Sequence, residues 1–116
     1  MKGEDLRQRT KLFALRIIRL VNSLPNNIAG QNIGRQLFRS GTSTAANYRA
    51  VCRSKSNADF ISKLGTVIEE VDESAFWLEM IIESDLLRKE LIYSLLDEAN
   101  QITAIMVSSK KSASKK

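Results

Sequence analysis

The sequence has no histidine, one cysteine and one proline, and each of these scarcities excludes a class of protein. Without histidine, the chain cannot build a Ser-His-Asp triad, a histidine proton shuttle or most zinc and di-iron centres. Because Cys52 stands alone, an intramolecular disulfide and a Cys-x-x-Cys metal site are also excluded. One proline and five glycines are too few for the many turns of an all-β protein. Aromatic residues make up only 6%, which leaves few platforms on which unpaired bases could stack.

Long apolar runs are missing as well. No segment approaches the roughly 18 apolar residues of a membrane span. The N-terminal segment MKGEDLRQR is too charged for a signal peptide, so we expect a cytoplasmic protein without membrane contact. With 116 residues, of which 43% are hydrophobic and 27% charged, the chain has the size and composition of one folded domain.

Apolar residues recur at spacings of three and four along four segments, which predicts four amphipathic helices over about residues 4–23, 31–54, 57–84 and 87–107. The connections between them are short, so consecutive helices should be antiparallel neighbours. The predicted fold is therefore all-α, an antiparallel up-down-up-down four-helix bundle in a single domain over residues 1–107. The last residues, 108–116, carry four lysines and no apolar anchor, and we expect a disordered basic tail.

Several positions make specific predictions about packing. Gly41 interrupts a helix at a cost of about 1 kcal/mol relative to alanine, so we expect a neighbouring helix to pack closely against it. Cys52 continues the inner stripe of the same helix and should act as a small buried hydrophobe. Other apolar residues lie off the inner stripes, which favours a homo-oligomer. The predicted interface residues are Phe38, Ile61, Ile68, Phe76 and Trp77, and Ile92 shares the same pattern.

Charge is segregated along the chain. Residues 1–56 hold eleven Lys or Arg against two Asp or Glu, whereas residues 57–85 hold one Lys against eight Asp or Glu. This pattern has two interpretations that can both hold. Basic and acidic helices can meet within the bundle or across a subunit interface. Alternatively, an exposed basic face can meet a polyanion.

The basic residues of the first two helices fall at one end of the predicted bundle, because the start of one helix adjoins the end of the next. Arginine and lysine at such an end bind phosphates by charge and do not read bases, although they can equally form a solvated face. The predicted nucleic-acid contacts are Arg7, Arg9, Lys11, Arg49, Arg53 and Lys55.

Counting outward from each turn also predicts a layer of polar residues across the helices. Its members are Arg16, Arg39, Ser40, Ser43, Asn47, Glu70 and Glu73. Such a layer fixes helix register, and arginine would hold the carboxylates ionised, which makes them poor general acids. A magnesium site on the acidic segment is the alternative, with Glu69, Glu70, Asp72 and Glu73 as ligands. We favour the structural role and predict no catalytic residue, metal or cofactor.

A run of segments in one continuous order resembles a known bacterial family. The segments include Gln36-Leu-Phe-Arg-Ser-Gly-Thr-Ser43, Ala46-Asn-Tyr-Arg49 and Glu70-Val-Asp-Glu73, within a match from about Leu12 to Ile82. Together they resemble the 23S rRNA intervening-sequence proteins, a family that also contains Avd, the accessory variability determinant of diversity-generating retroelements. Two positions depart from the family pattern: Ala50 stands where glutamate is usual, and Glu69 stands where lysine is frequent.

The resemblance implies a left-handed bundle and a ring-like homo-oligomer, typically a pentamer. It also implies nucleic acid as a partner and, as in Avd, a reverse transcriptase or another protein. The sequence therefore predicts a non-enzymatic, oligomeric bundle that binds RNA or DNA by phosphate neutralisation. A protein-interaction scaffold is the competing function, and a metal-dependent nuclease is the third.

Overall fold

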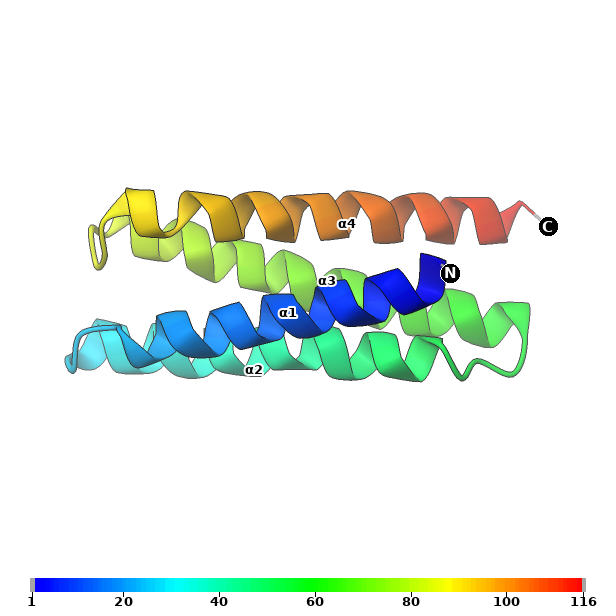
Figure 1. Cartoon of the computed structure of the whole chain (residues 1–116), viewed down its shortest axis with the longest axis horizontal. Helices are drawn as coiled ribbons and strands as arrows, with labels where there is room; N and C mark the ends of the chain where they lie inside the picture. The colour runs from blue at the N-terminus through cyan, green and yellow to red at the C-terminus, as the bar shows by residue number, and fades with distance from the viewer. Residues whose placement is uncertain (1, 116) are drawn as a thin grey trace.

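Four long helices form the bundle in the computed structural model, which describes residues 2–115. They are α1 (Lys2–Asn22), α2 (Ile28–Val51), α3 (Asn57–Glu83) and α4 (Tyr93–Ser114), with a short 3-10 helix, η1 (Lys89–Leu91), before α4. Successive helices run in opposite directions (Figure 1), so the predicted all-α, up-down-up-down bundle is confirmed. The handedness of the bundle stays a prediction. The molecule is elongated, with extents of 47 × 21 × 18 Å.

The predicted apolar stripes form the core. Phe13 and Ile17 of α1 meet Leu37 of α2, and α3 and α4 complete the cluster with residues such as Leu78 and Ile102, all of them buried. Helix α4 packs mainly on α3 and less on α1, as Figure 1 also shows. The core is therefore continuous along the whole bundle. The residues that lie off these stripes form the surface of the bundle.

Gly41 allows α1 and α2 to approach closely. A β-carbon at position 41 would lie 2.8 Å from two carbon atoms of Ile17, which is closer than such atoms can pack. The prediction of a close helix contact at Gly41 is thus confirmed. Gly30 is required for a different reason, because a β-carbon there would lie 2.0 Å from the carbonyl oxygen of Pro25 in the connection between α1 and α2.

Side-chain caps define where two of the helices begin. Asn27 accepts a hydrogen bond from the backbone N–H of Gly30 at 2.8 Å and caps α2. Ser56 accepts one from the backbone N–H of Asp59 at 3.0 Å and caps α3. Each cap satisfies a backbone donor that the first helical turn leaves without a partner.

The chain between α3 and α4 corrects the predicted start of the last helix. Leu87 and Leu91 were expected on its inner face, but α4 begins at Tyr93. Leu87 packs against the core from the connection, whereas Leu91 lies in η1 with 54% of its surface exposed. Ile92, which was expected off the inner stripes, is fully buried. Asp85 explains the break, since its φ of 56° ends α3 in the left-handed region and sends the chain back across the end of the bundle.

The predicted disordered tail is also corrected. Helix α4 continues through residues 108–114, with Lys115 at its C-cap. Ala113 is buried, and its carbonyl oxygen accepts a hydrogen bond from the side chain of Asn57 at 2.9 Å. The serine and alanine side chains of this segment are small, so it packs beside the start of α3. The buried Ala113 thus anchors the last turns of α4, although the segment has no large apolar residue.

Candidate nucleic-acid interface

Three cations line a groove between α1 and α2. Arg7 and Lys11 are four residues apart on α1, and Arg49 faces them from α2 across Ala45 and Ala46. The groove has a volume of about 180 Å³. The two alanines keep its floor low, while the three long side chains are exposed at its walls. Such an arrangement presents positive charge to solvent along a shallow channel, which suits a phosphate backbone.

The cations of this groove form few ion pairs within the protein. Arg7 has one exposed contact, 3.4 Å from its Nη1 to a carboxylate oxygen of Glu4. Among residues 3–115, Lys11 and Arg49 have no carboxylate within 4.0 Å. Arg53 and Lys55 follow the end of α2 and are both exposed. Five of the six predicted nucleic-acid contacts therefore lie at one end of the bundle with their charges accessible.

Arg9 behaves differently from the other five. Its guanidinium turns to α4 and donates to both carboxylate oxygens of Glu98 at 2.8 Å, and to the side chain of Gln101 at 2.8 Å. A two-pronged ion pair of this kind neutralises both charges and holds the side chain in place. The structure thus separates Arg9 from the basic groove and gives it the role of a link between α1 and α4.

The predicted polar layer is present in part. Arg39 of α2 bridges two carboxylates of α3, with 3.0 Å from its Nη1 to Glu70 and a second contact from its Nη2 to Glu73. The same Glu73 accepts a hydrogen bond from the indole of Trp77 at 3.1 Å. The guanidinium of Arg39 lowers the pKa of Glu73 below its ordinary value, and the Trp77 bond acts in the same direction. Glu73 is therefore an ionised structural group and a poor proton donor.

Other members of that layer have different partners. Ser40 is fully buried and shares a hydrogen bond of 2.9 Å with Ser74 of α3, a partner that the sequence argument missed. Arg16 was expected beside Arg39, but it donates to Ser94 of α4 at 2.7 Å. Asn47 donates to the Ser43 carbonyl within its own helix at 2.8 Å. The polar contacts thus tie α2 to α3 and, separately, α1 to α4.

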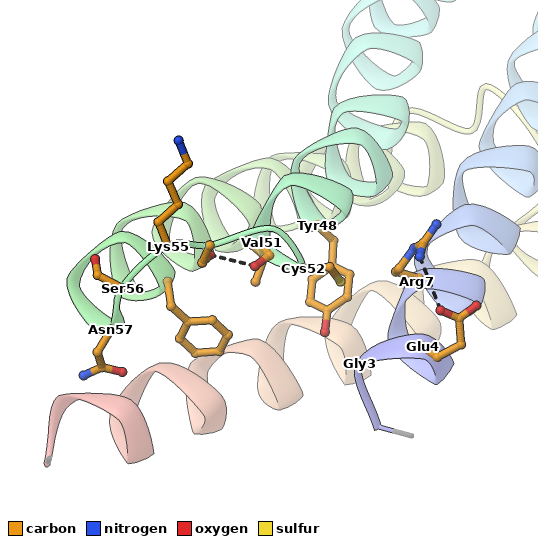
Figure 2. A pocket seen from close by; sticks show the side chains of 11 residues that line it. Gly3, Glu4, Arg7, Tyr48, Val51, Cys52, Lys55, Ser56 and Asn57 are labelled. Carbon is orange, nitrogen blue, oxygen red and sulfur yellow. Dashed lines mark hydrogen bonds and ion pairs between the residues drawn. The ribbon is translucent and has the colours of Figure 1, made fainter.

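A larger pocket opens beside the basic groove, where the start of α1 meets the α2–α3 connection (Figure 2). Its volume is about 710 Å³. Tyr48, Val51 and Phe60 supply apolar surface, and Arg7 and Lys55 lie at its edges. Burial raises the pKa of Tyr48 to about 12, and the neighbouring Cys52 thiol adds to the shift. Sequence reasoning missed this pocket, because its walls come from three segments that only the fold brings together.

Cys52 is an exposed residue of this pocket, which corrects the expectation of a buried cysteine. It forms the C-cap of α2, one residue beyond the last buried position, Val51. The 3.6-residue period places positions 51 and 52 about 100° apart, so a helix can bury only one of them against the same neighbour. The inner stripe ends with valine, and the thiol faces the pocket.

The predicted interface residues divide into two groups. Phe38 and Phe76 are exposed by 46% and 48%, as expected for a surface that meets another molecule. Ile61, Ile68 and Trp77 are half-buried. Ile68 and Trp77 pack against the core of their own chain, and the Trp77 ring contacts that of Phe76 edge to face. Two exposed leucines on α1, Leu12 and Leu15, were not among the predicted interface residues.

The described residues hold neither a cluster of metal ligands nor a helix that could cross a membrane. Within residues 2–115, no group of three or more Asp, Glu, Cys or His side chains is placed to hold a metal ion. Glu70 and Glu73, two of the four carboxylates considered for magnesium, are engaged by Arg39 instead. None of the helices in this range has the length and apolar character that crossing a membrane requires.

The fold and the site together define a charged four-helix-bundle protein with a basic groove toward one end. The chain belongs to the family of 23S rRNA-intervening sequence proteins, whose family model matches residues 4–108. It is also similar to a crystal structure of a protein with unknown function from the S23 ribosomal protein family of Bacteroides thetaiotaomicron VPI-5482. That similarity has a TM-score of 0.85 and 32% sequence identity, and covers 96% of this chain and 99% of the other. No curated protein matches the chain, and neither description names an enzyme class.

Proposed function

We propose that this protein is a non-enzymatic, oligomeric bundle that binds RNA or DNA by neutralising phosphates with its basic end. The observation that supports this most directly is the α1–α2 groove, where Arg7, Lys11 and Arg49 converge with little internal neutralisation. Arg53 and Lys55 extend the same surface. Because exposed cations replace condensed counterions on a nucleic acid, binding of this kind depends steeply on salt and weakly on sequence.

Self-association is the second part of the proposal. Phe76 lies on α3 among the exposed acidic residues Asp72 and Glu79, which are four and three residues away and share its face. Leu12 and Leu15 lie on α1, with the exposed Arg19 four residues beyond Leu15. Two apolar patches with rims of opposite charge fit each other in a head-to-tail contact between copies. Repetition of such a contact closes a ring, and the pentamer implied by the family resemblance is one such ring.

A ring strengthens the proposed binding. Each copy supplies a basic end of modest affinity, and symmetry places several of these ends on one assembly. A long polyanion can then engage several ends at once, so the assembly binds more tightly than a single copy does. In the competing function, a scaffold for a protein partner such as a reverse transcriptase, the same exposed patches dock that partner and the basic end has no special affinity for nucleic acid.

Charge reversal at the basic end tests the proposal. In the double variant Arg49→Glu with Arg53→Glu, RNA and duplex DNA binding should weaken at least tenfold, and the slope of log affinity against log salt should become shallower by about two. The measurement is a fluorescence-anisotropy titration at several salt concentrations, with circular dichroism to verify the fold.

The matched control reverses Arg35 and Arg88 to glutamate. Both residues are exposed, Arg35 lines a hollow at the opposite end of the bundle, and the net charge changes equally. The control should retain most of the affinity. If both variants lose the same affinity, net charge alone governs binding. If neither loses any, or if the unaltered protein binds no nucleic acid at low salt, the basic end is not a nucleic-acid surface.

A further inference from the structure

The pocket beside the basic groove contains polar groups that the fold uses and others that it leaves available. Ser54 donates to the Val51 carbonyl at 2.6 Å, Ser56 caps α3, and the Asn57 amide donates to Ala113 of α4. These three side chains stabilise the backbone around the pocket through these hydrogen bonds, so we assign them no role in binding a ligand. The side chains of Tyr48 and Cys52 are different, because within residues 3–115 neither side chain caps a helix or forms an ion pair.

Tyr48 combines a buried ring with a hydroxyl that reaches the pocket. Only 5% of its surface is exposed, yet it lines the cavity. Figure 2 shows its hydroxyl at the end of the ring, directed into the open space near Gly3. A β-carbon at Gly3 would lie 3.9 Å from that oxygen, an ordinary van der Waals distance, so Gly3 borders the hydroxyl without blocking it. The neighbouring Cys52 thiol is a weak hydrogen-bond partner, which leaves the hydroxyl able to bind a stronger one.

Phe60 supplies an aromatic surface in the same pocket. It is half-buried, packs its inner side on the core and lines the cavity with the remainder. An aromatic ring face and a nearby hydroxyl are the two features that hold an unpaired nucleobase, by stacking and by a hydrogen bond to its edge. The volume of about 710 Å³ lies within the range of small-molecule sites, so a single base and its sugar can enter.

The cations lie at the rim and not inside the pocket. In Figure 2 the Lys55 side chain extends away from Tyr48, and Arg7 lies on the opposite side beside Glu4. Arg7 also lines the α1–α2 groove, so the groove and the pocket are adjacent. A strand whose phosphates follow the groove therefore passes the mouth of the pocket. This placement allows the phosphate backbone of the strand to lie along the groove while one of its bases enters the pocket.

From these positions we infer that the Tyr48–Phe60 pocket binds one unstacked base of a single-stranded nucleic acid. The inference rests on the proposed function and deepens it, because it selects single strands over duplexes. Bases in a duplex are stacked and paired and cannot enter a recessed pocket without being extruded. The low aromatic content of the chain is consistent with one such base site in each copy.

Binding of matched single-stranded and duplex oligonucleotides tests this. At equal salt, a short single-stranded RNA of mixed sequence should bind the unaltered protein about tenfold more tightly than the corresponding duplex. Single-stranded DNA of the same sequence should share the preference.

Variants of the two pocket residues test their roles. In Phe60→Leu, which keeps an apolar side chain, the preference for single strands should fall to about twofold while the duplex affinity is unchanged. Tyr48→Phe should lower the single-strand affinity by about threefold through loss of one hydrogen bond. Tyr93→Leu removes an exposed aromatic ring of α4, away from the pocket, and should change nothing.

Cys52 offers a second measurement that needs no mutation. It is the only cysteine of the chain and lines the pocket, so its alkylation by a neutral maleimide reports whether the pocket is open. Saturating single-stranded RNA should slow alkylation at least fivefold, and duplex at equal occupancy should not. If the protein binds nucleic acid but the Cys52 rate and the Phe60 variant are unaffected, the pocket is not a base site and the proposed function stands. If the protein binds neither form, both proposals fail together.

Discussion

At the scale of single residues, two glycines occupy helix interiors in opposite surroundings. A β-carbon at Gly41 would lie 2.8 Å from Ile17, in the contact between α1 and α2. A β-carbon at Gly65 of α3 would meet only the flexible end of Lys110, at 3.4 Å. The same substitution therefore tests helix propensity at one site and helix packing at the other.

Gly65→Ala should raise the free energy of unfolding by up to about 1 kcal/mol, because alanine is the better helix former. Gly41→Ala should lower the free energy of unfolding by about 1–2 kcal/mol, because the cost of forcing α1 away from α2 exceeds the gain in helix propensity. Urea unfolding followed by circular dichroism measures both. A stabilised Gly41→Ala variant would mean that α1 shifts at little cost and that the small residues of α2 have another purpose.

At the scale of secondary-structure elements, the end of α3 decides where α4 begins. The backbone N–H of Leu86 bonds to the carbonyl of Ile81 at 3.1 Å, and that of Asp85 to Ile82 at 3.1 Å. Together with the positive φ of Asp85, these bonds form a Schellman motif, in which glycine is the usual residue. An aspartate here adds strain and places a negative charge at the negative end of the helix dipole.

Asp85→Gly should therefore stabilise the protein by about 0.5–1 kcal/mol, measured as a rise in the urea midpoint. The control is Asp85→Ala, which removes the charge but keeps a β-carbon in the left-handed region. If alanine stabilises as much as glycine, charge and not backbone strain is the cause. If Asp85→Gly does not raise the urea midpoint, contacts of the Asp85 side chain in the turn offset both the backbone strain and the unfavourable charge.

At the scale of the whole molecule, the proposed self-association depends on the exposed apolar patches. Phe76→Glu would place a further charge among Asp72 and Glu79 and so remove the proposed contact with Leu12 and Leu15 of another copy. Light scattering after size-exclusion chromatography should then report the 13.0 kDa monomer, whereas the unaltered protein should elute as a homo-oligomer. Tyr93→Glu, at an exposed aromatic of α4, is the control and should keep the oligomer. An unaltered protein that is monomeric, or a Phe76→Glu variant with unchanged mass, contradicts this contact.

Sequence periodicity determined the fold class because burial of an amphipathic face is a repeated, local property. Leu64, Val67, Val71 and Leu78 recur at helical spacing, and all are buried where the pattern predicts. Counting levels outward from the turns also brought Arg39 to Glu70 and Glu73, because antiparallel helices with short connections have a fixed register. The family match follows from the same continuous sequence.

Only the tertiary structure decided which way individual polar side chains turn at the boundary between two helices. Arg9 and Arg7 are two residues apart and equally basic, yet Arg9 bonds to Glu98 of α4 while Arg7 lines the groove with Arg49. Cys52 lies outside the core because α2 ends one residue before it, and residues 108–114 stay helical because Ala113 meets Asn57. These outcomes depend on partners distant in the chain, which no local pattern specifies. The Tyr48 pocket has the same origin, since three helix ends enclose it.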